Sequence, residues 1–275
     1  MLTEKQLKDI KELQNVCERA ESIQLKLNWD MLKSSSWEIE NSFLFYENQK
    51  LIGFLAVYPF GNKAELCGMV HPAYRRRGIF TSGMEEALKQ IKGSYRKVLL
   101  NAPSDSASAK AFLKNVSCEY DSTEYQMQWQ PMELADDEGV TVRLSQTEDD
   151  FQKEVALDVQ CFGFTNEEAI EYNERIKEDP AQIFYMIDWQ ETTVGKIRVS
   201  HIDKAAWIYG FSVFPEWQGR GFGRKALNQL TKRKFEKGYQ VFLEVDADNS
   251  NALKLYQSCG YETVQAQDYY LYKWK

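Results

Sequence analysis

The second half of this sequence repeats landmarks of the first half at a nearly constant distance. Both halves carry a Val-x-Pro segment, which begins at Val70 and again at Val213. The repeated landmarks keep their order and lie 142 to 145 residues apart: Gly53 with Gly195, Val70 with Val213, Gly78 with Gly221, Ala109 with Ala252, and Trp129 with Trp274. Such regular spacing over five positions indicates a duplicated domain, which constrains the chain to two similar folds.

The repeat and the length of 275 residues together predict two domains. We place the first over residues 1–130 and the second over 140–275. Residues 131–139 hold one Pro, one Gly and an acidic run, so they are interpreted as a linker.

Helices alternate with strands in the same order in both halves, which predicts an α/β fold. A capping box at Thr3 and Gln6 begins the first helix, whose predicted buried face is Ile10, Leu13, Cys17 and Ala20. The last predicted strand covers residues 269–274.

Composition excludes several classes of function. The chain has 34 basic and 41 acidic residues and a net charge of −7. Phosphate backbones are bound by clustered Lys and Arg, so no nucleic-acid partner is expected. No apolar run approaches the roughly 20 residues that cross a bilayer, and the acidic first twenty residues are unlike a signal peptide. Five scattered cysteines are typical of reduced thiols in the cytoplasm. Only two histidines are present, so no metal site is expected.

A glycine-rich loop in the second half has the character of a phosphate site. Residues 213–223 read Val-Phe-Pro-Glu-Trp-Gln-Gly-Arg-Gly-Phe-Gly, between an apolar strand and an amphipathic helix predicted over 222–236. Glycines before a helix let backbone N–H groups approach an anion, and the helix dipole favours negative charge there. The Rossmann fingerprint would need a glycine where Arg224 stands, and the Gly-Lys-Ser/Thr of a Walker loop is missing. The remaining alternative is an ordinary tight turn between strand and helix.

The complete pattern Val-x-Pro-x-x-Gln-x-x-Gly-x-Gly resembles the acyl-CoA signature of the GNAT N-acetyltransferase superfamily. Further matches to that family's next strand and helix follow in its order and spacing: Leu243-Glu-Val245, Asn249-x-x-Ala252, Leu255-Tyr256 and Gly260-Tyr261. The resemblance implies two tandem GNAT-like domains, each a mixed, mostly antiparallel twisted sheet flanked by helices. It also implies acetyl-CoA as co-substrate, with no metal.

The resemblance further implies which residues bind the cofactor. Asn249 would lie near the pantetheine arm, and its type also suits the N-cap of the next helix. The strand backbone would pair with the pantetheine arm and the loop would hold the pyrophosphate, which gives the remaining cofactor-binding set: Phe211, Ser212, Val213, Gln218, Gly219, Arg220, Gly221, Phe222, Gly223 and Arg224.

Acetyl transfer to an amine needs a base and an acid. An alkylammonium has a pKa near 10.4 and must lose a proton, whereas the departing CoA thiolate must gain one. Strand alternation over 240–246 puts Glu244 on the face opposite Leu243 and Val245. Tyr256 follows twelve residues after Glu244 (256 − 244), a spacing that resembles GNAT members in which Glu is the base and Tyr the acid. The alternatives are an exposed strand carboxylate and a core aromatic.

Other residues remain candidates for parts of the chemistry. Asp246 is a second possible base, and a water is a third route for the proton. Cys161 and Cys259 raise a covalent alternative, although no histidine is near them in sequence. His201 is more simply read as a structural histidine than as a base.

The first half has lost most of these features. Arg75 stands in the place of Gln218, and Gly78 alone remains of the three glycines. At the offset of 143, Glu244 falls on Asn101 (244 − 143) and Tyr256 on Leu113 (256 − 143). The first domain is therefore predicted to lack the acid–base pair, and whether it binds CoA stays open.

These inferences lead to one preferred function. The chain is expected to transfer acetyl from acetyl-CoA to a primary amine, either a small molecule or a peptide N-terminus, by direct attack in a ternary complex. The alternatives are a non-catalytic acyl-CoA-binding sensor or scaffold, and a tandem transferase that uses aminoacyl-tRNA. The acceptor itself and the choice between monomer and homodimer are not specified by the sequence.

Overall fold

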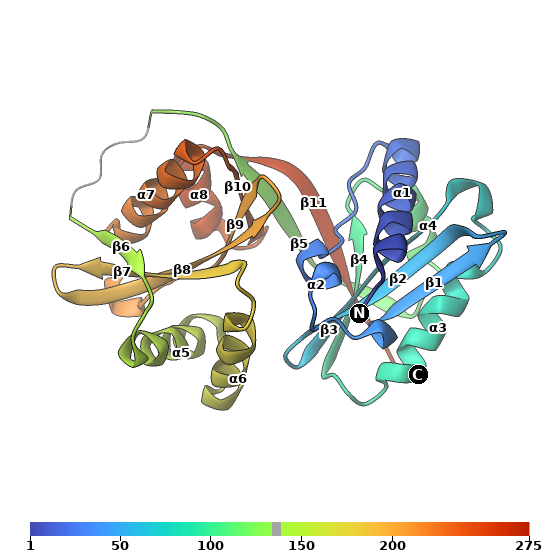
Figure 1. Ribbon diagram of the computed structural model, residues 1–275, viewed down its shortest axis with the longest axis horizontal. Helices are drawn as coiled ribbons and strands as arrows, with labels where there is room; N and C mark the ends of the chain where they lie inside the picture. The colour runs from blue at the N-terminus through green and yellow to red at the C-terminus, as the bar shows by residue number, and fades with distance from the viewer. Residues whose placement is uncertain (134–138, 275) are drawn as a thin grey trace. The chain divides into compact units, whose positions relative to one another are not determined.

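The computed structural model describes residues 1–133 and 139–274 and divides the chain into two compact units. The first unit contains Met1–Glu124 and Gln265–Lys275, and the second contains Tyr125–Val264. Each unit has its own helices and its own run of strands, within what the pairing records as one 11-stranded sheet (Figure 1). Among the described residues, no helix is long and apolar enough to cross a membrane.

The first unit is a mixed sheet with helices on both faces. Its strands lie in the order β1-β2-β3-β4-β11, with β3 and β4 parallel and the pairs β1–β2, β2–β3 and β4–β11 antiparallel. Its elements are α1 (Glu4–Glu21), α2 (Trp29–Lys33), β1 (Ser42–Glu47), β2 (Lys50–Phe60), β3 (Lys63–Val70), α3 (Ile79–Ile91), β4 (Lys97–Pro103), α4 (Ala107–Leu113), the first part of β5 (Cys118–Trp129) and most of β11 (Tyr261–Tyr272).

Alternate residues of the central strands supply two hydrophobic clusters in the first unit. Phe54 and Tyr58 of β2 join α1 and α2 in one cluster, whereas Leu55 and Val57 join α3 and α4 in the other. Helix α1 begins with the predicted Thr3–Gln6 capping box. Its buried face includes Ile10, Leu13 and Cys17 as predicted, but Ala20 is exposed and Gln14 is buried instead, so that part of the prediction was wrong.

The second unit repeats this plan. Its sheet has the order β5-β10-β9-β8-β7-β6, in which β9 and β10 are parallel and the pairs β6–β7, β7–β8 and β8–β9 are antiparallel. Its elements are the end of β5, β6 (Thr141–Leu144), α5 (Glu148–Phe162), α6 (Asn166–Lys177), β7 (Gln182–Trp189), β8 (Thr192–Ile202), β9 (Ala205–Val213), α7 (Phe222–Glu236), β10 (Gln240–Asp246) and α8 (Ser250–Ser258).

One face of the second sheet carries the main core of this unit. Ile208 of β9 and Leu243 of β10 pack there with Leu227 of α7 and Tyr256 of α8. Helices α5 and α6 lie on the other side of the sheet (Figure 1), where Lys196 of β8 forms an ion pair of 2.6 Å with a buried carboxylate of α5. The predicted fold class, two tandem α/β domains with mostly antiparallel mixed sheets, is confirmed in both units.

The compact units differ from the division at residues 130 and 140 that the repeat suggested. The last strand accounts for the difference at the C-terminus, since Gln267–Leu271 of β11 pairs with Leu99–Pro103 of β4. Residues 125–129 belong to the second unit, where the Trp129 indole N–H donates to the carbonyl of Cys259 at 3.0 Å. Residues 134–138 of the predicted linker lie outside the described residues.

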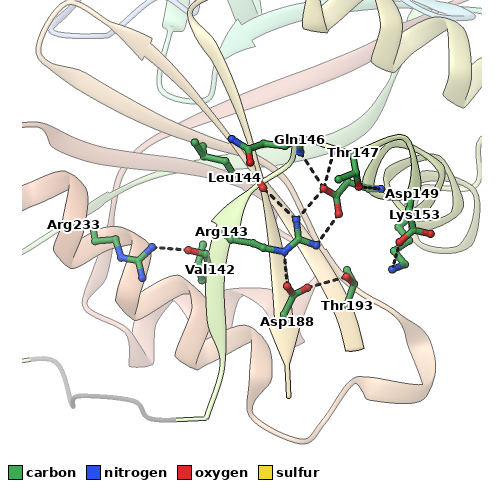
Figure 2. A network of polar contacts seen from close by, with 11 residues as sticks. Val142, Arg143, Leu144, Gln146, Thr147, Asp149, Lys153, Asp188, Thr193 and Arg233 are labelled. Atoms are coloured by element: carbon green, nitrogen blue, oxygen red, sulfur yellow. Dashed lines mark hydrogen bonds and ion pairs between the residues drawn. The ribbon is translucent and has the colours of Figure 1, made fainter. Parts of the chain in front are cut away.

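A partly buried ion-pair network links β6 to the start of α5. The Arg143 guanidinium donates to both carboxylate oxygens of Asp150 at 2.7 and 2.9 Å and to Asp188 of β7 at 2.5 Å. Figure 2 shows Arg143 between Asp188 and the loop of Gln146 and Thr147. Asp150 is 1% exposed and also accepts from the backbone N–H groups of Gln146 and Thr147. The hydrogen bonds from Arg143, more than any other contact, hold the pKa of Asp150 well below its usual range.

We expect the substitution Asp150→Asn to lower the free energy of unfolding by about 2 kcal/mol at pH 7, because it weakens charge-assisted bonds to a buried group. A carboxylate whose pKa is lower in the folded state stabilises the folded protein at pH values above its unfolded-state pKa of about 3.9. This stabilisation is lost as the pH falls through the folded-state pKa. The difference between wild type and variant in the free energy of urea unfolding should therefore stay constant from pH 7 to about pH 5 and shrink as the pH falls below about 3.9. Asp149→Asn, at a mostly exposed neighbour, is the control, and equal losses in both variants would contradict the assignment.

Candidate active site

The parallel strands β9 and β10 separate at the end that carries the predicted site. Their pairing runs from Ala205–Gln240 to Ile208–Leu243, after which β9 continues to Val213 and β10 to Asp246. At this point β9 contains a bulge: Ser212 lies opposite Lys196 and Tyr209 opposite Arg198, so three steps along β9 match two along β8. A bulge bends its strand and redirects the backbone groups beside it. We call the space between the two strand ends the second strand opening.

The bulge explains a detail of the repeat. The offset between the halves is 142 at Lys63–Ala205, where the third strand of each repeat begins, and 143 at Val70–Val213, where it ends. The extra residue lies at Gly210, which has a φ of +53°, in the left-handed region that favours glycine. In the first unit, β2 and β3 pair in continuous register from Gly53–Val70 to Phe60–Lys63. The bulge therefore belongs to the second unit alone.

The glycine loop has the backbone that an anion site needs. Gly219 and Gly221 have φ values of +73° and +85°, and a Cβ added at either would meet no atom within 4 Å. Gly221 is the N-cap of α7 and supplies no side-chain bond to the first turn of that helix. The first N–H groups of an α-helix have no partner within the helix, and anion sites at helix N-termini use this geometry.

Two side chains of the loop have structural contacts that the sequence did not reveal. The Gln218 amide donates to the carbonyl of Val213 at 2.9 Å, which ties the loop to the end of β9. The Phe222 ring lies 5.4 Å from that of Trp189 and 5.8 Å from that of Trp217, so the aromatic side chain packs within the protein. Arg220 stacks on Trp217 at 4.8 Å, and Arg224 is exposed.

Phe211 of the bulged strand β9 lies near both the start of α7 and Tyr256. A Cβ at Gly223 would lie 3.2 Å from the Phe211 ring, so a larger residue there would push against that ring where α7 starts beside β9. On its other side the Phe211 ring lies 6.3 Å from that of Tyr256. Burial, followed by the neighbouring Cys259, raises the pKa of Tyr256 to about 12, so its phenol keeps its proton at neutral pH.

Glu244 lies on the face of β10 opposite to the core. Leu243 and Val245 on either side of it are buried, whereas Glu244 is half-buried. Phe242 shares the face of Glu244 and stacks on Trp207 at 4.8 Å. Tyr256 packs in the core cluster with Leu243, so the proposed base and acid occupy opposite faces of β10. A substrate in the second strand opening would have both faces of β10 beside it.

The other candidates have contacts that disfavour a chemical role. The exposed Asp246 carboxylate accepts from the N–H of Asp248 at 2.8 Å and so holds the turn before α8. Burial raises the pKa of the Cys161 thiol, which donates to the carbonyl of Val213 at 3.5 Å, and a protonated thiol is a poor nucleophile. His201 contacts the Lys234 ammonium at 3.1 Å, and burial together with that charge lowers its pKa.

Asn249 is the N-cap of α8, and its side chain accepts from the N–H of Ala252 at 3.1 Å. Ser212 is buried in β9 next to Val213. Residues 1–133 and 139–274 contain no group of three or more His, Cys, Asp or Glu side chains that would hold a metal ion.

The corresponding loop of the first unit keeps a similar backbone with only one of the three glycines. Arg76, which replaces Gly219, has a φ of +65°, and Gly78 has a φ of +78°. A non-glycine residue in the left-handed region costs about 1 kcal/mol or more. The loop geometry has thus been retained in spite of the substitution.

Two further repeated contacts escaped the sequence comparison. Cys17 donates to the carbonyl of Val70 as Cys161 does to that of Val213, and Thr3 caps α1 as Thr147 caps α5. Both pairs lie 144 residues apart (161 − 17 and 147 − 3). A search at this slightly different offset would have found them.

Comparison with known proteins agrees with this geometry. The model of the acetyltransferase (GNAT) family matches residues 7–116 and again residues 149–261. The N-alpha-acetyltransferase RimI of Mycobacterium tuberculosis is 44% identical over 57 residues, which are 21% of this chain and 35% of that protein. The chain thus spans about a third of that relative's length. A mycothiol acetyltransferase of Saccharomonospora viridis is 26% identical over 235 residues, 77% of this chain and 74% of that enzyme.

Among solved structures, a GCN5-related N-acetyltransferase from Sphaerobacter thermophilus has the same fold, with a TM-score of 0.77 at 18% identity over 96% of this chain and 91% of that one. Both halves of the chain match the family model, each half has the mixed sheet described above, and the second carries the bulge and the glycine loop. The chain belongs to the acetyltransferase (GNAT) family, as a tandem protein with two copies of the domain.

Proposed function

We propose that the second unit transfers an acetyl group from acetyl-CoA to a primary amine, by direct attack in a ternary complex. The observation that carries this proposal is the position of Phe211 in the bulged strand β9: its ring lies near the start of α7, which follows the uncapped glycine loop, and near the protonated Tyr256. The glycine loop would bind the pyrophosphate, as its backbone suits an anion. Backbone N–H groups near the bulge would polarise the thioester carbonyl.

In this proposal Glu244, directly or through a water, takes the proton of the acceptor ammonium. The free amine attacks the thioester carbonyl carbon and a new C–N bond forms. The nitrogen then releases its second proton to water, and the C–S bond breaks. Tyr256 gives its proton to the departing thiolate and is reprotonated from solvent. General acids and bases of this kind contribute about a hundred- to ten-thousand-fold to rates.

The acceptor side of the site supports an amine with a flat apolar group. Trp207 and Tyr209 of β9 are stacked at 6.3 Å, Phe242 stacks on Trp207, and Arg198 lies 5.0 Å from the Tyr209 ring. These half-buried rings share their face with Glu244. A small aromatic amine and an amino-terminal peptide with an aromatic side chain both suit such a surface.

The test is thiol release from acetyl-CoA with a panel of amines. We expect release that depends on both substrates. Aromatic amines and amino-terminal peptides should be preferred to spermidine, because the half-buried rings beside Glu244 offer stacking to a flat group, which spermidine lacks. Mass spectrometry of the product would confirm N-acetylation. Tight acetyl-CoA binding without thiol release from any amine would support the non-catalytic sensor or scaffold instead.

A further inference from the structure

The last residue of α1 makes an unusual set of contacts in the first unit. The Glu21 carboxylate pairs with the Arg75 guanidinium and accepts from the Ser106 hydroxyl at 3.0 Å. It also accepts from the Ser108 hydroxyl at 2.6 Å and from the Ser108 N–H at 3.3 Å. The side chains of Glu21 and Arg75 are 15% and 27% exposed, so the group is mostly shielded from water. We call these four residues the Glu21 clasp.

The Glu21 clasp joins the two ends of a strand opening. In the first unit the parallel pairing of β3 and β4 runs from Lys63–Lys97 to Leu66–Leu100. Beyond it, β3 leads through Val70 to the loop with Arg75, and β4 leads through Pro103 to the start of α4 with Ser106 and Ser108. Because one carboxylate bonds to both segments, it spans the opening that corresponds to the proposed acetyl-CoA site of the second unit.

The second unit has the same framework with a different arrangement of charge. Arg75 donates to the carbonyl of Val70 at 3.1 Å, as Gln218 donates to that of Val213, and Ser106 caps α4 as Asn249 caps α8. At the offset of 144 shared by the two helices' cysteines, Glu21 corresponds to Thr165 (21 + 144), which caps α6. The bonds of Gln218 and Asn249 are local, and neither carries a charge.

The contacts of the clasp also occupy groups that would otherwise be available to bind a phosphate. Arg75 stands in the place of Gln218 and carries a charge that would suit a phosphate, but its guanidinium is engaged by Glu21. Burial opposes ionisation of Glu21, but hydrogen bonds from Ser108, Arg75 and Ser106 outweigh it and lower its pKa. The site therefore holds a negative charge where a pyrophosphate would need positive partners.

We propose that Glu21 closes the first unit's strand opening, so that the chain binds one equivalent of acetyl-CoA rather than two. The carboxylate takes the position of the ligand's anionic portion between the Arg75 loop and the start of α4. The inference rests on the proposed acetyl-CoA site of the second unit only for the total number of acetyl-CoA molecules that the chain binds. The closure of the first unit stands on its own contacts.

The test is a calorimetric titration of the full-length chain with acetyl-CoA. We expect one equivalent for wild type and the same for Arg75→Ala, because the first unit contributes no site. Glu21→Ala should add a second, weaker equivalent by releasing Arg75, and Arg75→Ala in that background should remove it. Glu21→Gln keeps the size of the side chain while removing its charge, so it should also bind a second equivalent of acetyl-CoA. It serves as the test if the alanine variant does not fold. Glu12→Ala, on the exposed side of α1, is the matched control and should change nothing.

The deciding result is the difference in the number of acetyl-CoA equivalents bound by a Glu21 variant and by its parent, however many the parent binds. A wild type that binds no acetyl-CoA would reject the proposed function of the second unit, while a gain of one equivalent in Glu21→Ala would still support the clasp. Two equivalents in wild type, reduced to one by Arg75→Ala, would overturn the clasp. Folded Glu21→Ala and Glu21→Gln proteins without an added equivalent would overturn it as well.

Discussion

The substitution Gly221→Asp should abolish measurable binding of acetyl-CoA at the second unit. Gly221 is the N-cap of α7, and an aspartate there would bond to the free N–H groups of the first turn and place a negative charge beside the pyrophosphate. Two unit charges about 4 Å apart near a protein surface interact by about 4 kcal/mol. We therefore expect the dissociation constant to rise at least about a hundred-fold in calorimetric titration.

The chain supplies a matched control for this experiment. Gly78 is the N-cap of α3 and has a φ of +78°, against +85° for Gly221, and a Cβ at either position meets no atom within 4 Å. Gly78→Asp therefore carries a similar backbone cost and adds the same charge at the other loop. We expect it to leave acetyl-CoA affinity unchanged. Equal affinity in wild type and Gly221→Asp would contradict the proposed phosphate site.

Glu244→Gln and Tyr256→Phe should each lower kcat by about a hundred- to ten-thousand-fold, because each removes a group that moves a proton during transfer. The dissociation constant of acetyl-CoA should change little, since neither substitution alters the glycine loop. Asp246→Asn is the control for Glu244: its carboxylate holds the turn before α8, so kcat should stay near wild type. Wild-type turnover in both variants would contradict the assignment and leave Asp246 or a water as the candidate base.

The pH dependence of turnover tests the role of Tyr256 as the acid. Burial raises the pKa of Tyr256 to about 12, so the phenol remains protonated from pH 6 to 9 and its contribution is constant over that range. The ratio of wild-type to Tyr256→Phe turnover should therefore be the same at pH 7 and pH 9. A ratio that falls steeply with rising pH would mean that Tyr256 loses its proton much earlier than its burial implies.

The sequence allowed the repeated fold to be predicted because periodicity and glycine positions are local signals. The strand Gln240–Asp246 and the helix Phe222–Glu236 have the predicted bounds. Helix α6 was missed because its exposed face is highly charged, although Thr165 and Glu168 form a capping box that could have revealed it. Strand β11 begins at Tyr261 rather than 269, since its polar, partly exposed residues do not alternate clearly.

The candidate site was less accessible to sequence reasoning, because it depends on register and on contacts between distant segments. The glycine loop could be located from its residues, but the bulge at Gly210 appears only when β8 and β9 are paired. The roles of Gln218 and Phe222 depend on Val213 and Trp189, which the spacing of a motif does not specify. The Glu21 clasp joins residues 54 and 85 positions apart, and an isolated carboxylate at the end of a helix gives no sequence signal.

The most direct test of a single catalytic site in the second unit is thiol release by the double variant Glu244→Gln/Tyr256→Phe. It should be measured with saturating acetyl-CoA and the best acceptor, with and without alanine at Arg75, Arg76 and Arg77. We predict that turnover falls to a small residual value and that the arginine substitutions do not lower it further, because Asn101 and Leu113 of the first unit can neither take nor give a proton. Substantial turnover that disappears when the three arginines are changed would place catalysis in the first unit and contradict this account.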